Sequence, residues 1–67
     1  MALMAKKATT WPPKRIRALR LRLGLTQTEA GVKVGVSQRQ WAAWESGQRK
    51  PSKSAQLLLT LIDQGKI

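Results

Sequence analysis

The chain has 67 residues and a formal net charge of +10, from 13 Lys and Arg residues against three acidic residues. A chain of this length supports one small core, and the absence of cysteine and histidine excludes disulfides and the commonest metal ligands. This charge favours a polyanionic partner, nucleic acid first, over a cationic membrane-surface peptide or a merely basic protein such as a ribosome-associated one.

The start of the chain is predicted to be an arm followed by a helix. Residues 1–13 read as a basic, flexible arm that ends in a proline pair, and residues 14–67 as the folded domain. The arm lacks the hydrophobic middle of a signal peptide, and no later apolar run could span a bilayer, so we expect a cytoplasmic protein without a membrane partner. The first helix should follow the prolines and end at Gly24, with a core face made of Ile16, Leu19 and Leu23.

Two short helices should come next, joined by a tight turn. Thr26 and Glu29 have the spacing of a capping box that begins the second helix, and Gly35 suits the left-handed residue that ends it. The same spacing recurs from Ser37 to Gln40, which predicts a third helix over 38–46.

So short a joint forces these helices to cross steeply, and small residues in the second helix would let them approach closely. Ala30 and Gly31 lie at the middle of that helix. A glycine there costs about 1 kcal/mol of helix stability relative to alanine, which a packing requirement would offset. The alternative is that Gly31 is a tolerated weak position.

The third helix is predicted to have one aromatic and one small, polar face. At the helical period Trp41 and Trp44 lie about 60° apart and define the buried side. The opposite side carries Arg39, Ala42, Ala43 and Ser46. Gly47 should end this helix.

A fourth, leucine-rich helix should follow a basic loop, with Ser52 or Ser54 as its cap. Its apolar stripe consists of Ala55, Leu58, Leu59 and Ile62. Leu57 and Leu61 widen the apolar arc to about 200°, more than one small core needs. We expect a second copy of the chain to cover the excess; the alternative is a helix wrapped deeply by its own domain.

Residues 16–52 resemble the helix-turn-helix domain of lambdoid phage repressors, Cro proteins and related XRE-type regulators. The resemblance rests on LRxxxGLTQ (Leu19–Gln27), on the GVS turn before residue 38, and on WExGxRxPS (Trp44–Ser52). It implies an all-α fold: a compact bundle of four or five helices, lambda repressor-like, whose third helix enters the major groove of DNA. Relatives usually carry alanine where this chain has Gly31.

The resemblance also implies roles for individual residues. The expected base contacts are Gln38, Arg39, Ala42 and Ala43, with glutamine suited to adenine, arginine to guanine and alanine to a thymine methyl. The expected phosphate contacts are Gln27, Thr26, Ser37, Arg49, Lys50 and Lys53, although the loop cations could also be a solvated cluster. The expected structural residues are Trp41 and Trp44, which hold the third helix to the core, and Arg20 and Glu45, which form a partly buried ion pair.

The expected function is a sequence-specific regulator of transcription, a repressor above all, that binds double-stranded DNA. The resemblance implies a bacterial or phage-encoded, nucleoid-associated homodimer on half-sites about 34 Å apart. The alternatives are an antitoxin-type autoregulator with a toxin partner, and a nonspecific nucleic-acid-binding module. We expect no cofactor, no metal and no enzymatic activity, because a chain without histidine or cysteine lacks the usual acid, base and metal-binding groups.

Overall fold

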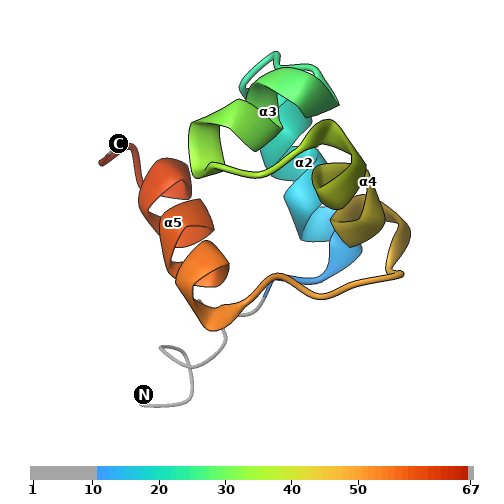
Figure 1. The fold of residues 1–67 in the computed structure, drawn as a ribbon. Coiled ribbons are helices and arrows are strands. Elements are labelled where there is room, and N and C mark those ends of the chain that lie inside the picture. The colour runs from blue at the N-terminus through green and yellow to red at the C-terminus, as the bar shows by residue number, and fades with distance from the viewer. Residues whose placement is uncertain (1–10, 67) are drawn as a thin grey trace.

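The computed structural model describes residues 11–66, and residues 1–10 of the predicted arm lie outside that range. The described chain is all-α, as predicted, with the helices labelled as in Figure 1: α2 (Pro13–Arg22), α3 (Gln27–Val34), α4 (Gln38–Ser46) and α5 (Lys53–Asp63). Helix α4 packs against both α2 and α3, and α5 packs against α3. The chain between α4 and α5 crosses the lower side of the bundle in this view (Figure 1).

Local side-chain caps set where the helices begin. The Thr26 hydroxyl accepts a hydrogen bond from the Glu29 amide at 3.0 Å, and the Glu29 carboxylate accepts one from the Thr26 amide at 2.8 Å, which completes the predicted capping box of α3. At α4 only the first half of the predicted box forms, from the Gln40 amide to the Ser37 hydroxyl at 3.1 Å. Of the two candidate caps for α5, Ser52 is the one used.

The turn between α3 and α4 explains Gly31. Gly35 ends α3 in the left-handed region, with φ of 81°. The chain then folds back over α3, and a Cβ at Gly31 would lie 2.6 Å from the Val36 carbonyl oxygen and 3.2 Å from that of Ser37. We predicted a close approach between two helices, and the structure shows instead that the backbone of the turn approaches α3 at Gly31. The packing explanation for Gly31 therefore holds, and Gly31 is not merely a tolerated weak position.

The hydrophobic core extends further toward the N-terminus than predicted. Trp11, which we assigned to the arm, is only 5% exposed and donates a hydrogen bond from Nε1 to the Thr60 hydroxyl at 2.9 Å. The Arg15 guanidinium lies 3.9 Å from the centre of the Trp11 ring. The packed part of the chain thus includes Trp11, which lies before residue 14. The core comprises Trp11, Ile16, Leu19, Ala30, Val34, Trp41, Trp44, Ala55, Leu59 and Ile62.

Helix α5 leaves part of its apolar arc uncovered. Leu59 and Ile62 are buried, whereas the side chains of Leu57 and Leu61 are 58% and 36% exposed. Residues 11–66 therefore do not wrap this helix fully, which is evidence against the second of our two explanations for its wide arc. In residues 11–66 no helix has both the length and the apolar character needed to cross a bilayer.

Candidate nucleic-acid interface

Helix α4 separates a buried aromatic side from an open outer side. Trp41 and Trp44 are each 2% exposed, and their tilted rings lie 5.5 Å apart, centre to centre. Together they fix the helix to the bundle. Gln38 and Arg39, in the first turn, are exposed. Ala42 and Ala43, in the next turn, are half-buried and have short side chains. The long side chains of the outer side therefore lie at the N-terminal end of α4, and the surface of its middle turn is close to the helix backbone.

Two depressions, each of about 410 Å³, flank this outer side. One is lined by Ser37, Arg39, Gln40, Ala43, Gln48 and Arg49. The other is lined by Arg17, Arg20, Gln27, Ala42, Glu45 and Ser46. Helix α4 is thus a ridge between two hollows, and each hollow has cationic side chains in its wall.

Sequence reasoning missed Arg17, which we treated as part of a solvated face of the first helix. The structure brings this exposed residue of α2 into the same depression as Gln27 and Ala42. Its position depends on how α2 packs against α4, and the sequence around it carries no signal of that packing beyond its charge.

Arg20 and Glu45 form the expected ion pair between α2 and α4. Arg20 donates from Nε to Oε2 of Glu45 and from Nη2 to Oε1 at 3.1 Å, and the two side chains are 14% and 8% exposed. Trp41 Nε1 also donates to Oε2. Burial raises the pKa of Glu45, but hydrogen bonds from Arg20, Trp41 and Gln27, with the Arg20 charge, bring that pKa below its ordinary value. The carboxyl group is therefore ionised near neutral pH.

Two predicted DNA contacts, Gln27 and Gln38, are joined to each other and to this ion pair. Gln27 Nε2 donates to Glu45 Oε1 at 3.1 Å, and Gln38 Nε2 donates to Gln27 Oε1 at 2.7 Å. The side chain that begins α3 and the one that begins α4 thus lie side by side on the same edge of the ridge.

The predicted phosphate contacts are spread along the molecule rather than gathered in one cluster. The hydroxyls of Thr26 and Ser37 accept from backbone amides as caps, which leaves each hydroxyl proton free to donate to an anion. Arg49 lines the depression beside Arg39. Lys53 is the exposed first residue of α5.

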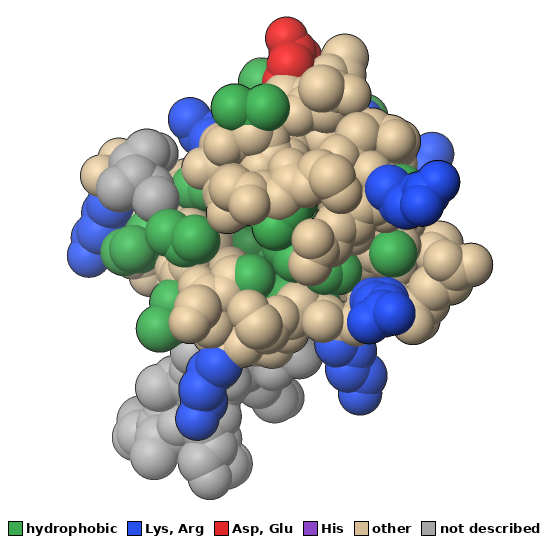
Figure 2. Space-filling view, in the orientation of Figure 1, with side chains coloured by type: hydrophobic (Ala, Val, Ile, Leu, Met, Phe, Trp, Pro, Cys, Tyr) green, Lys and Arg blue, Asp and Glu red, His purple; other side chains and the backbone are tan. Residues whose placement is uncertain are grey.

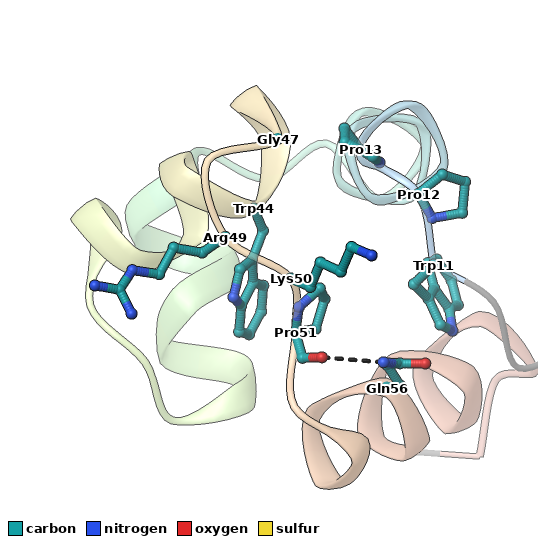
Figure 3. Close-up of a pocket in the computed structure, with 9 residues that line it drawn as sticks. All are labelled: Trp11, Pro12, Pro13, Trp44, Gly47, Arg49, Lys50, Pro51 and Gln56. Carbon is teal, nitrogen blue, oxygen red and sulfur yellow. Dashed lines mark hydrogen bonds between the residues drawn. The ribbon is translucent and has the colours of Figure 1, made fainter.

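The side chain of Lys50 extends the opposite way from that of Arg49, although both residues line one cavity (Figure 3). This cavity of about 450 Å³ is also lined by Trp11, Trp44 and neighbouring prolines. Figure 3 shows its side chain directed across this cavity toward Trp11, while Arg49 extends the opposite way. At the cavity floor, the Gln56 amide donates to the Pro51 carbonyl at 3.0 Å and holds the loop to α5.

In Figure 2, Lys and Arg side chains lie at the right-hand edge, over α4 and the chain that follows it, and also at the left and lower edges, while the acidic side chain in this view lies at the top, by α3. Two of the acidic residues, Glu45 and Asp63, are committed to ion pairs with arginines of α2. The open side of α4 therefore carries an excess of positive charge.

A comparison with known protein families matches residues 14–61 to one family, described as Helix-turn-helix domain. This match covers α2, α3, α4 and most of α5, well over half of the chain. The chain belongs to the helix-turn-helix domain family. Within it, α3, the turn at Gly35 and α4 form the helix-turn-helix unit, and domains of this kind place the second helix of the unit in the major groove of DNA. No curated protein and no solved structure matches the chain.

Proposed function

We propose that this helix-turn-helix domain is a sequence-specific, double-stranded-DNA-binding regulator of transcription that acts as a repressor, similar to the lambdoid repressors and Cro proteins. The observation that carries the proposal is the two-sided build of α4: buried indoles on one side and, on the other, an exposed glutamine and arginine at its N-terminal end. Side chains of this length at a helix N-terminus reach base edges when the helix lies in the major groove.

The surroundings of α4 support the same placement. A helix in the major groove runs between two phosphate backbones, and α4 has a cation-lined hollow on each side. Arg49 would serve one backbone, and Arg17, with the amide end of α3 at Gln27, the other. The short side chains of Ala42 and Ala43 would let the helix approach the bases closely.

In-vitro selection of duplexes from a random pool tests the proposal, followed by titration of a selected duplex and a scrambled one across salt concentrations. We expect a defined half-site sequence. Gln38→Ala and Arg39→Ala should each lose about 1 to 3 kcal/mol at a single base-pair position, and Arg49→Ala should weaken all duplexes alike. Equal competition by scrambled DNA at every salt concentration would refute the proposal.

We further propose that the domain binds as a homodimer through α5, because Leu57 and Leu61 present apolar surface one helical turn apart. Sedimentation of Leu57→Glu should show monomers at concentrations where the parent chain is dimeric. Val32→Glu is the matched control, since Val32 is a 74% exposed apolar residue of α3. Equal sedimentation of all three proteins would exclude this interface.

A nonspecific nucleic-acid-binding module is the second candidate, and the observation that favours it is the short outer surface at Ala42 and Ala43, which offers few groups for base recognition. An antitoxin role, with a toxin as partner, remains a proposal that the gene neighbourhood would test.

A further inference from the structure

The proposed function makes no use of the cavity of about 450 Å³ at the C-terminal end of α4, which we call the loop cavity. Its walls come from segments that are distant in the sequence, and include Trp11, Pro12 and Pro13 at the start of α2, Trp44 of α4, Lys50 of the loop and Gln56 of α5. Small-molecule sites usually have volumes of about 300 to 1,000 Å³, so this cavity suits a ligand about the size of a fused two-ring molecule.

The walls of the loop cavity are largely apolar, and they are held in place. Trp11 and Trp44 are only 5% and 2% exposed, so they close its base, while the exposed rings of Pro12 and Pro13 border it. The hydrogen bond from Trp11 Nε1 to the Thr60 hydroxyl, at 2.9 Å, fixes the first indole. A site that is already formed loses little conformational freedom when a ligand binds.

Lys50 brings to the loop cavity a positive charge that no acidic side chain neutralises. Its side chain extends across the cavity toward Trp11 (Figure 3). None of the lining residues is acidic. The three acidic side chains of the chain are bound elsewhere: Glu29 in the α3 capping box, Glu45 to Arg20, and Asp63 to Arg15 and Arg22. A ligand that combines an apolar body with a negative charge therefore complements this cavity.

We propose that the loop cavity is a binding site for a small aromatic carboxylate, whose ring lies against the prolines and whose carboxylate pairs with the Lys50 ammonium group. A flat, rigid ligand gives up little freedom in a site walled by rigid rings. The lysine ammonium is a compact point charge, which suits a group of single negative charge. Arginine is the residue that binds phosphate in a two-pronged way, and the side chain of Arg49 extends away from Lys50 (Figure 3).

Other occupants fit the loop cavity less well. Residues 1–10 contain Lys6 and Lys7 and no acidic residue, so they would bring more positive charge to Lys50. A DNA phosphate, which we expected Lys50 to contact, would pair with the ammonium group but leave the apolar wall in water. An aromatic carboxylate uses both the charge and the apolar surface.

The test measures binding of 2-naphthoate to the full chain by calorimetry, with 2-naphthamide as a neutral probe of the same shape. No DNA is present, so the result does not depend on the proposed function. We expect a Kd of about 1 mM or below for 2-naphthoate, from the binding energy per atom that is typical of small ligands. The neutral probe should bind about threefold to fivefold more weakly, because ion pairs at exposed lysines are weak.

Three variants assign the binding energy to the loop cavity. Lys50→Met keeps the side-chain stem and removes the charge, so it should bind both probes equally. Lys53→Met is the matched control, since Lys53 is an exposed lysine that does not line the cavity, and it should keep the parent's difference between the probes. Pro12→Ser removes one ring of the wall and places a favourable cap before α2, so it should weaken both probes by about threefold.

NMR of the parent chain locates the bound probe. The amide resonances of Lys50 and Gln56 and the indole N–H resonance of Trp11 should shift with 2-naphthoate, whereas those of Lys33, an exposed lysine of α3, should stay in place. Inorganic phosphate should leave the Trp11 resonance where it is.

Four results would overturn the inference. Equal shifts at Lys33 and Lys50 would mean that 2-naphthoate binds to the cationic surface in general. An equally large shift of the Trp11 resonance by inorganic phosphate would mean a site for any anion. A difference between the probes that persists in Lys50→Met would remove Lys50 from the site. Absence of binding would show that the cavity is closed to ligands in solution.

Discussion

Replacing Arg20 by methionine should destabilise the domain by about 3 kcal/mol, because it leaves the Glu45 carboxylate buried without its countercharge. The Glu45 side chain is 8% exposed, and Arg20 supplies two of its four hydrogen bonds as well as the countercharge. A hydrogen bond to a charged group contributes about 1.5 to 3 kcal/mol, and the donors that stay, Trp41 and Gln27, limit the loss to the lower end of the usual 3 to 5 kcal/mol.

The assay is urea unfolding followed by tryptophan fluorescence, with Arg17→Met as the matched control. Arg17 is an exposed cation on the same helix, so its replacement should change the free energy of unfolding by less than about 0.5 kcal/mol. A loss below about 1 kcal/mol for Arg20→Met near neutral pH would refute the reasoning, because it would mean that Glu45 is stable without its partner.

The same pair predicts the direction of the pH dependence. The pKa of Glu45 is lower in the folded chain than its ordinary value of 4.5, so the unfolded chain takes up the proton first. The stabilisation is therefore complete above that ordinary value and is lost as the pH falls through the folded-state pKa. Acid should also bring the stabilities of the parent chain and Arg20→Met closer together, and a gap that stays constant as the pH falls below the ordinary value of 4.5 and the chain unfolds would contradict this.

Three further substitutions test other parts of the structure. Gly31→Ala should lower the free energy of unfolding by about 1 to 3 kcal/mol despite the better helix propensity of alanine, because its Cβ would meet the Val36 carbonyl; equal or higher stability in urea would show that the turn can shift. Trp11→Phe should lower the free energy of unfolding by about 1 to 2 kcal/mol in the same assay, because the indole hydrogen bond to Thr60 of α5 is lost. An unchanged free energy of unfolding would show that this hydrogen bond does not stabilise the domain. Arg17→Ala should reduce the slope of log affinity against log salt by about 1. The control is Lys66→Ala, which changes an exposed lysine after α5 that lines neither depression beside α4, and an equal slope in the two variants would exclude a phosphate contact at Arg17.

Helix boundaries were predictable because their signals are local. The Thr26 box, the Ser37 cap and the left-handed Gly35 each act within four residues, and a single sequence contains all that these interactions need. The burial of Trp41 and Trp44 was predictable for a similar reason, since helical periodicity alone places both on one side. The all-α fold follows once four such segments are present.

Features that depend on packing between distant segments were not predictable from periodicity. Trp11 precedes the first helix and contacts Thr60 near the other end of the chain, so nothing in its own neighbourhood indicates burial. The reason for Gly31 was only partly foreseen, because close approach was expected from a helix and came from the backbone of the turn. The link between Gln27, Gln38 and Glu45 joins side chains 11 and 18 residues apart, and requires three helix orientations at once.

The Arg20–Glu45 pair also predicts the result of replacing both partners together. A buried ion pair replaced by apolar residues of similar volume often leaves a protein as stable as before, or more stable. Arg20→Met combined with Glu45→Leu should therefore recover most of the stability lost in Arg20→Met alone. Urea unfolding measures this recovery. A double variant that stays as unstable as Arg20→Met would show that the loss comes from packing around α4 rather than from the unpaired Glu45 carboxylate.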